Sequence, residues 1–222
     1  MSSISVVIPC HNEADGIAEV IASVPKPVFE IIVVDNNSTD ASAQIAARSG
    51  ARIVKESRKG YGFALRAGFA AAKGDVIVTI DGDGQYPASE VKRAVKYLDD
   101  NNLDFVICSR FPLDDKKAMN FTRRFGNAFF TILTNILFRV RFTDSWSGMM
   151  CFRTSIVPEL NLESGDMPLS QEIKIKAARN KNLRYGEVHV GYAPRVGDSK
   201  LSPFRHGFQM LGYSFELWNK LR

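Results

Sequence analysis

The chain has few cysteines and no long apolar run, and each absence excludes a class of protein. Its 222 residues contain three cysteines, Cys10, Cys108 and Cys151, at wide spacing and with no Cys-x-x-Cys pair. This pattern excludes a disulfide framework and a thiolate zinc site and favours a reducing compartment. No stretch reaches the roughly 18 apolar residues of a membrane span, and the opening MSSIS lacks the features of a secretory leader. We therefore expect a cytoplasmic protein that is neither exported nor membrane-spanning.

The remaining composition is that of an ordinary globular protein. Hydrophobic residues make up 45% of the chain and charged residues 24%, which excludes a disordered or collagen-like chain. The sequence contains no internal repeat and no low-complexity segment. A length of 222 residues is enough to bury a substantial core. We expect a single domain over residues 1–222.

The net charge of +5 is unevenly distributed. Residues 110–142 hold seven Lys and Arg against two acids, and residues 179–222 hold eight against three, so each segment carries +5 and the remainder −5. A basic surface beside an acidic site suits anionic lipid headgroups, phosphates or nucleic acid. The basic residues lack the aromatic pattern of RNA-binding motifs, so we expect no nucleic-acid partner.

The first half of the chain alternates short β-branched runs with amphipathic segments of helical length. This alternation is typical of a parallel sheet built from βαβ units. We expect strands at 4–8, 30–34, 52–55, 75–80 and 104–108 and helices at 15–24, 40–49, 61–72 and 88–101. Beyond them we expect a helix over 121–142, a strand at 149–153, a helix at 170–180, a strand at 185–190 and a helix at 203–221. The second half would then elaborate the same sheet.

The segment DGDGQ places Asp81, Asp83 and Gln85 directly after an apolar strand. Open α/β sheets bind ligands at the carboxyl ends of their strands. Alternate residues of an extended segment point the same way, so these three side chains can bring their oxygens to one hard cation, Mg²⁺ or Mn²⁺. The intervening Gly82 leaves room for a ligand. An EF-hand is excluded, because Tyr86 stands where that loop requires Gly.

Two further strand ends contribute polar residues to the same edge. Pro9, His11 and Glu13 follow the first strand, and Asp35 ends the second. A carboxylate at Asp35 can accept hydrogen bonds from a base or a ribose, while Glu13 can orient a nucleotide. The alternative for Asp35 is a simple polar turn. Several acids at one sheet edge favour nucleotide binding.

The segment KGYGFALRAG, residues 59–68, invites comparison with the dinucleotide fingerprint. Gly60 and Gly62 follow a strand and open a helix, but Leu65 stands at the third Gly/Ala position and the strand is the third of the sheet, not the first. We therefore exclude an NAD site. Two alternatives remain. Either the loop passes close to a nucleotide with Lys59 near its phosphates, or the glycines form a plain tight turn.

The ordered motifs IPCHNE, VDNNSTD, GYGFALRAG and DGDGQYP resemble those of the family 2 glycosyltransferases with a GT-A fold. The later DSWSGMMCFR and QEIKIKAARN blocks are similar to the dolichyl-phosphate mannose synthase and polyprenyl-phosphate glycosyltransferase branch. The resemblance runs from residue 4 to about residue 201. It implies an α/β fold with a mostly parallel sheet flanked by helices and a C-terminal elaboration. Residues 1–110 would bind the nucleotide sugar, and residues 111–222 would face the acceptor and a membrane.

The resemblance also implies roles for individual residues. Asp81, Asp83 and Gln85 correspond to metal ligands, and Asp83, Arg110, Arg123 and Arg195 to the catalytic set. Residues assigned to the nucleotide sugar are Pro9, His11, Glu13, Asp35, Asn37, Lys59, Asp81, Gly82 and Asp83. Residues assigned to the acceptor are Arg110, Arg123, Asn127, Ser199 and Lys200. The expected partners are a nucleotide sugar, a polyprenyl phosphate, an anionic membrane surface and a small membrane-anchoring protein.

Residues 121–142 combine a Phe-rich apolar face with arginines at both ends. Apolar residues recur at three or four positions: Phe121, Phe125, Phe129, Leu133, Ile136, Leu137 and Val140. This pattern predicts a helix that lies in a membrane interface, on the cytoplasmic face of a membrane. The alternative is an ordinary surface helix that covers the sheet.

The function implied is an inverting transfer of a hexose from a nucleotide sugar, of the GDP-mannose or UDP-glucose type, to a polyprenyl phosphate. An ionised phosphate acceptor needs no general base. Two alternatives stay open: the same fold acting on a sugar or protein hydroxyl with Glu172 as base, and a non-catalytic carbohydrate-binding or membrane-scaffold protein.

Overall fold

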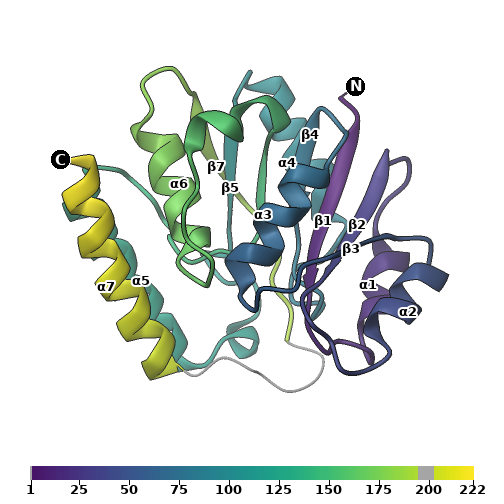
Figure 1. The fold of residues 1–222 in the computed structure, drawn as a ribbon. Helices are drawn as coiled ribbons and strands as arrows, with labels where there is room; N and C mark the ends of the chain where they lie inside the picture. The colour runs from purple at the N-terminus through teal and green to yellow at the C-terminus, as the bar shows by residue number, and fades with distance from the viewer. Residues whose placement is uncertain (1, 195–202) are drawn as a thin grey trace.

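A seven-stranded sheet forms the centre of the molecule (Figure 1). The computed structural model describes residues 2–194 and 203–222, with the side chains of residues 203–206 left aside. The strands are β1 (Ile4–Cys10), β2 (Glu30–Asp35), β3 (Arg52–Lys55), β4 (Val76–Thr79), β5 (Phe105–Ser109), β6 (Met150–Arg153) and β7 (Tyr185–His189). Their order is β3-β2-β1-β4-β6-β5-β7, and β6 alone among these seven runs antiparallel to its neighbours. The predicted mostly parallel sheet is confirmed.

Helices cover both faces of the sheet. They are α1 (Ile17–Ser23), α2 (Ser42–Arg48), α3 (Tyr61–Ala71), α4 (Glu90–Asp100), α5 (Phe121–Phe138), α6 (Leu169–Arg179) and α7 (Pro203–Leu221), with short 3₁₀ turns at Lys116–Ala118, Thr154–Ile156 and Pro158–Leu160. Side chains of α1, α2 and α4 pack in one core layer, and those of α3, α5, α6 and α7 in the other. The strands between the two layers are apolar on both faces because both faces are covered.

Alternation along β1 shows how the sequence divides its side chains between the two layers. Val6 and Ile8 join the α1 and α4 side, while Val7 joins the α3 side. All three are fully buried. This register aligns Cys10 with Asp35 and Val7 with Thr79, so the carboxyl ends of β1, β2 and β4 lie together. The loops that follow these three strands therefore meet at one edge of the sheet.

Helix α5 ends at Phe138, four residues before the end predicted from periodicity. Arg139 takes the left-handed conformation, with φ 55°, that commonly closes a helix. The Asn135 side chain then bonds both backbone groups of Phe142, each at 2.9 Å, and holds the chain as it leaves. Val140 and Phe142 are buried in the core. The apolar pattern of the sequence continues past the end of the helix because Val140 and Phe142, in the loop that follows, are also core residues.

The faces of α5 are inverted relative to an ordinary surface helix. Its buried residues include Asn127, Thr131 and Thr134, whereas its outward face exposes Phe121, Phe125, Phe129, Ile132 and Ile136. Helix α7 lies beside α5 and exposes Phe208 and Phe215 (Figure 1). Of the predicted apolar face, Leu137 packs against the core and Val140 is buried, while Ile132 joins the exposed set. We call these seven exposed residues of α5 and α7 the outer apolar face.

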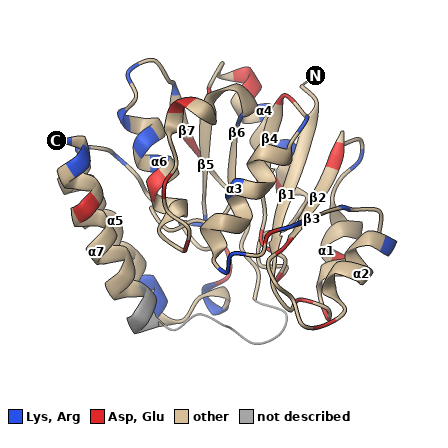
Figure 2. Ribbon diagram, in the orientation of Figure 1, with Lys and Arg blue, Asp and Glu red and all other residues tan. Residues whose placement is uncertain are grey.

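Charge is sparse along this pair of helices (Figure 2). Arg123 and Arg124 lie in the first turn of α5, and residues 125–138 contain no charged side chain. A contiguous apolar surface of this kind on a folded domain marks an interaction site. Among the described residues, no helix has the length and hydropathy needed to cross a bilayer.

The three cysteines lie in strands β1, β5 and β6, are free and are buried. Burial raises the pKa of Cys10 to about 11 and that of Cys108 further. Thiols held protonated in an apolar environment react slowly. The cysteines therefore serve as core residues, as their positions in the apolar runs predict.

Candidate active site

A cleft with a volume of about 390 Å³ opens where the ends of β1, β2 and β4 meet. Its walls include Pro9, His11, Glu13, Lys59, Asp81, Gly82, Asp83, Gln85 and Arg110, all of which the sequence analysis selected. They come from four separate parts of the chain, at the ends of β1, β3, β4 and β5. The strand register explains the convergence, since parallel neighbours deliver their following loops to the same edge.

The DGDGQ loop forms the floor of this cleft. Asp81 accepts a hydrogen bond of 3.1 Å from the Tyr61 hydroxyl, and a Cβ at Gly148 would lie 2.7 Å from the Asp81 Oδ2 atom. Gly148 thus lets the 144–148 loop approach the carboxylate closely. Asp83 accepts from the backbone N–H of Gln85 at 3.0 Å. The Gln85 amide nitrogen donates to the Ala193 carbonyl at 3.3 Å, which fixes this side chain at the cleft wall.

The chemistry of this loop fits a hard divalent cation. Asp81 and Asp83 supply carboxylate oxygens and Gln85 an amide oxygen, which are the donors that Mg²⁺ and Mn²⁺ prefer. Among the described residues no cluster of three or more His, Cys, Asp or Glu side chains is arranged to hold an ion. Two carboxylates suit a cation that also takes oxygen ligands from a diphosphate. The predicted trio is therefore compatible with a metal held jointly by protein and substrate.

On the β2 side, Asn36 lines the cleft in place of the predicted Asp35 and Asn37. Its amide nitrogen donates to the carbonyls of Glu56 and Arg58, and its Oδ1 accepts from the Gly60 N–H at 2.9 Å. His11 Nδ1 lies 2.9 Å from the Asn36 carbonyl, which can only accept, so Nδ1 carries the proton in this contact. Asn36 therefore ties three loops of the cleft together.

Asp35 and Asn37 point into the surrounding turn instead. Asp35 Oδ1 accepts from the Ser38 N–H at 3.1 Å, which is the polar-turn alternative for this residue. Asn37 donates to the Ser57 carbonyl. Neither belongs to the described lining of the cleft. All three residues lie in the motif VDNNSTD, and the alternation of side chains at the strand end decided which one faces the cleft.

The glycines of residues 59–68 permit a close approach between two protein loops. A Cβ at Gly60 would lie 2.2 Å from the Gly165 carbonyl oxygen, and one at Gly62 2.7 Å from the Asp166 nitrogen. Gly60 also has a φ of 147°, which side chains rarely adopt. The Phe63 N–H donates to the same Gly165 carbonyl at 2.9 Å. Both glycines are thus explained by packing, while Lys59 itself lines the cleft.

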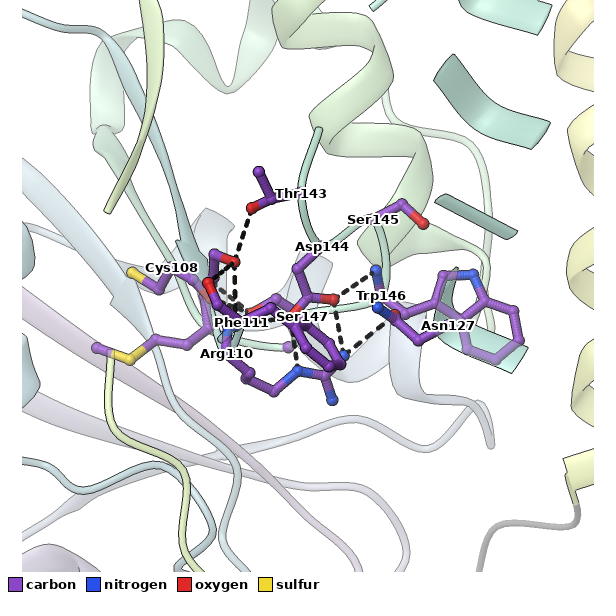
Figure 3. Close-up of polar contacts among 12 residues, drawn as sticks. Cys108, Arg110, Phe111, Asn127, Thr143, Asp144, Ser145, Trp146 and Ser147 are labelled. Atoms are coloured by element: carbon purple, nitrogen blue, oxygen red, sulfur yellow. Dashed lines mark hydrogen bonds and ion pairs between the residues drawn. The ribbon is translucent and has the colours of Figure 1, made fainter. Parts of the chain in front are cut away.

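Arg110 is held in a buried ion pair at the cleft wall (Figure 3). Its Nε and Nη2 atoms donate to the two oxygens of Asp144 at 2.7 and 2.8 Å, and Nη2 also donates to Asn127 at 3.3 Å. Burial alone would raise the pKa of Asp144, but the Arg110 guanidinium outweighs it and the pKa is lowered. Such a bidentate pair fixes the plane of the guanidinium. Tyr192 also contacts this guanidinium, whose central carbon lies 5.2 Å from the centre of the Tyr192 ring.

The remaining predicted acceptor residues are placed differently. Asn127, on the buried face of α5, contacts Arg110 and lies outside the described lining of the cleft. Arg123 occupies the first turn of α5 and does not line the cleft among the described residues. Arg195, Ser199 and Lys200 lie outside the described residues.

Glu172, the predicted base of the hydroxyl-acceptor alternative, does not reach the cleft. It is fully buried and accepts hydrogen bonds of 2.9 Å from the backbone N–H groups of Glu163 and Ser164. Lys176 pairs with it at 2.7 Å. A carboxylate held this way organises the loop before α6 and has no access to a substrate hydroxyl. The role assigned to Glu172 in that alternative is therefore wrong.

The 144–148 loop supplies functional residues for which the sequence offered only weak signals. Trp146 and Gly148 line the cleft. Beneath the loop, the fully buried Lys174 of α6 donates to the carbonyls of Ser145 and Ser147. Burial lowers the pKa of Lys174 to about 7. A lysine in an amphipathic helix predicts solvent exposure, so only tertiary packing revealed this contact.

Asp166, just before α6, is a further acid in the cleft wall. Its Oδ2 accepts from the Gln209 amide of α7 at 2.9 Å, and its Oδ1 from the Met167 N–H at 2.9 Å. No motif marks this residue. It links α7 to the cleft, because Asp166 lines the site and its carboxylate accepts a hydrogen bond from a side chain of that helix.

The fold is shared with an enzyme of known structure. Glucosyl-3-phosphoglycerate synthase from Mycobacterium tuberculosis, crystallised with Mn²⁺, UDP and phosphoglyceric acid, superposes with a TM-score of 0.76 at 23% identity, covering 98% of this chain and 78% of that chain. The same enzyme was also crystallised with Mg²⁺ and UDP. This similarity confirms the GT-A fold.

Sequence comparison identifies the family. An uncharacterized glycosyltransferase from Mycobacterium tuberculosis is 33% identical over 201 residues, covering 90% of each chain. The dolichyl-phosphate hexose transferase of Haloferax volcanii is 29% identical over 207 residues, covering 92% of this chain and 89% of that one. The sequence profile of glycosyl transferase family 2 matches residues 5–160. The fold, the acidic cleft and these matches agree, and the chain belongs to glycosyl transferase family 2.

Proposed function

We propose that this glycosyltransferase moves a hexose from a nucleotide sugar to a polyprenyl phosphate, with inversion at the transferred carbon. One observation carries the proposal: a cleft that holds paired carboxylates and a buried arginine lies next to a helix with an exposed apolar face. Trp146 of the cleft wall stacks on Phe130 of α5 at 4.3 Å, which joins the two features. The name of the Haloferax relative supports the same acceptor class.

The division of roles follows the position of each residue in the cleft. The nucleotide would contact Pro9, His11, Glu13 and Asn36. Residues 1–110 would thus bind the donor, and residues 111–222 would bind the acceptor together with Arg110 at the boundary. A phosphate oxygen of the acceptor attacks C1 of the sugar, the bond from C1 to the diphosphate breaks, and the nucleoside diphosphate leaves with the electron pair.

Arg110 would hold the acceptor phosphate, since Asp144 and Asn127 fix its guanidinium at the cleft wall. Arginine suits this role because its planar fork matches phosphate oxygens. Arg123 lies one turn before Asn127 on the same helix, so we retain it as a second contact to the acceptor phosphate. The phosphate is ionised near neutral pH, and the reaction therefore needs no general base.

Asp81, Asp83 and Gln85 would hold Mg²⁺ or Mn²⁺. When bound, the cation neutralises the charge that develops on the diphosphate leaving group. The Tyr61 hydroxyl keeps Asp81 oriented, because burial and the neighbouring carboxylate raise the pKa of Tyr61 and the phenol stays protonated.

We further propose that the protein works on the cytoplasmic face of a membrane. The outer apolar face would enter the interface, with Arg123 and Arg124 near anionic headgroups. A small membrane-anchoring protein would be compatible with this surface.

The proposal is tested by mass spectrometry of products from a panel of nucleotide sugars, including UDP-glucose and GDP-mannose, with undecaprenyl or dolichyl phosphate. We expect a hexosyl phospholipid product that requires Mg²⁺ or Mn²⁺ and is lost in EDTA. Asp83→Asn should fold normally and lose at least about 100-fold in rate, since the leaving group loses its electrostatic support. Transfer to a soluble hydroxyl acceptor, with none to polyprenyl phosphate, would contradict the proposal.

A further inference from the structure

Three aromatic rings connect the outer apolar face with the cleft. Phe129 of α5 is 52% exposed and makes an edge-to-face contact with Phe130 at 5.3 Å between ring centroids. Phe130 in turn stacks on Trp146 at 4.3 Å, with 26° between the ring planes. Trp146 lines the cleft together with Arg110. We call Phe129, Phe130 and Trp146 the aromatic row.

The cleft end of the aromatic row is fixed to the phosphate-binding side of the site. The backbone N–H of Trp146 donates to Asp144 Oδ1 at 3.3 Å, and the same carboxylate holds the Arg110 guanidinium (Figure 3). Asp144 therefore fixes both the Arg110 guanidinium and the backbone of Trp146. Both residues line the cleft, so one ligand can contact both.

The indole nitrogen of Trp146 does not open onto the cleft. Nε1 is buried and has no hydrogen-bond partner among the described residues. Trp146 therefore lines the cleft with its other atoms.

We infer that the aromatic row is the path of the acceptor's hydrocarbon chain from the bilayer to the cleft. The inference rests on the proposed function and specifies how that acceptor is bound. The first isoprene units would pack on Trp146 and Phe130, and the chain would leave past Phe129 into the lipid.

The chemistry of the row favours a chain over a sugar or a nucleotide base. The three rings belong to α5 and the 144–148 loop, whereas His11 and Asn36 of the cleft belong to the loops after β1 and β2. The row also continues to an exposed apolar surface. A soluble nucleotide sugar has no hydrocarbon chain to contact this apolar surface. A molecule with a phosphate head and a hydrocarbon tail would contact both the cleft and the apolar surface.

The test uses the fact that the chain has two tryptophans, Trp146 and Trp218. In Trp218→Phe, the remaining fluorescence reports on Trp146. We expect the emission to change on titration with geranyl phosphate, a soluble two-isoprene phosphate, and not with inorganic phosphate at the same concentration. The reciprocal Trp146→Phe protein should show no change with either compound.

A kinetic measurement supplements the binding test. Trp146→Leu and Phe130→Leu should each raise the KM for isoprenyl phosphates about tenfold while the KM for the nucleotide sugar stays unchanged. Phe29→Leu is the matched control, since Phe29 is 59% exposed and lies before β2, away from the row. This variant should have the same KM as the wild type for isoprenyl phosphates and for the nucleotide sugar.

The inference is overturned if geranyl phosphate leaves the emission of Trp218→Phe unchanged at concentrations up to the millimolar range, or if inorganic phosphate produces the same change. Failure of the proposed function would look different. In that case the Trp146 signal would respond to geranyl phosphate, but no nucleotide sugar would yield a glycosylated lipid.

Discussion

At the scale of single residues, the Arg110–Asp144 pair dominates the acceptor side of the cleft. Asp144 is fully buried and Arg110 nearly so. A buried pair adds little net stability, but loss of one partner leaves the other charge without compensation. The pair therefore has a stability effect that can be separated from its proposed role in catalysis.

We predict that Asp144→Asn lowers the free energy of unfolding by about 3 kcal/mol, because the Arg110 charge stays buried. Urea denaturation at pH 7 measures this change. Asp100→Asn is the matched control, since Asp100 forms an exposed pair with Lys96 and its loss should cost less than about 1 kcal/mol. Equal effects of the two substitutions would show that Arg110 is solvated when unpaired.

A second prediction at the scale of single residues concerns how Lys174 affects the pH dependence of stability. Its pKa is about 7 in the folded protein and 10.5 in the unfolded chain, so between these values the unfolded state binds more protons. Stability contributed by this group therefore rises as pH increases from 7 toward 10.5. Lys174→Met removes the contribution. Across this pH range, the free energy of unfolding of the wild type should rise relative to that of the variant by up to about 1.4 kcal/mol per pH unit.

Urea denaturation of both proteins at pH 7, 8 and 9 measures the difference. Taking the difference cancels the titration of all other groups that behave alike in both proteins. Lys96→Met is the control, because Lys96 is 75% exposed and lies on the surface. A parallel pH dependence of wild type and Lys174→Met would mean that the buried ammonium keeps its ordinary pKa.

At the scale of elements, the inverted faces of α5 have the clearest consequence. A polar inner face, with Asn127, Thr131 and Thr134, satisfies its hydrogen bonds against Arg110, Ser145 and Gln171. The apolar residues are thereby left outward. Their exposure is costly in water and favourable at a membrane interface.

We predict that Phe129→Asp combined with Ile132→Asp abolishes flotation with anionic vesicles. Both side chains are more than half exposed, so the variant should keep its circular dichroism spectrum and its Tm. The basic end of α5 adds about 1 kcal/mol per arginine near an anionic surface, and high salt should weaken binding of the wild type. Phe29→Asp should float like the wild type. If the double variant floats as well as the wild type, another surface of the protein contacts the membrane.

At the scale of the whole molecule, carboxylates set the response to acid. The pKa is lowered for Glu30, Asp75, Asp144 and Glu163, and reaches about 2 for Glu56, whose bonds come from Arg58. Burial raises the pKa of Glu187 and opposes this trend. A depressed folded pKa contributes stability that is present above the unfolded value and lost as pH falls through the folded value.

The free energy of unfolding should therefore fall as pH drops from about 4.5 to 2. Urea denaturation at pH 7, 4 and 3 tests this expectation. Constant stability over that range would indicate that the ion pairs are formed to the same extent in the unfolded chain.

Local pattern was sufficient for the first half of the fold. Apolar β-branched runs predicted β1 to β5, and periodicity with glycine and proline boundaries predicted the helices between them to within about two residues. A strand was predicted at the position of β6, but its antiparallel insertion between β4 and β5 was not, since a short apolar run does not indicate a pairing partner. Strand order depends on contacts far apart in sequence.

The sequence alone determined which motifs form the cleft. The motifs around Pro9, Lys59, Asp81 and Arg110 each lie at the end of a strand, and parallel strands bring these ends to one edge of the sheet. Only the tertiary structure decided which neighbour faces inward, as with Asn36 in place of Asp35, and which charges are buried, as with Glu172 and Lys174. The physical reason is that side-chain direction and burial depend on what packs above each residue. That partner comes from a distant part of the chain, and local periodicity carries no information about it.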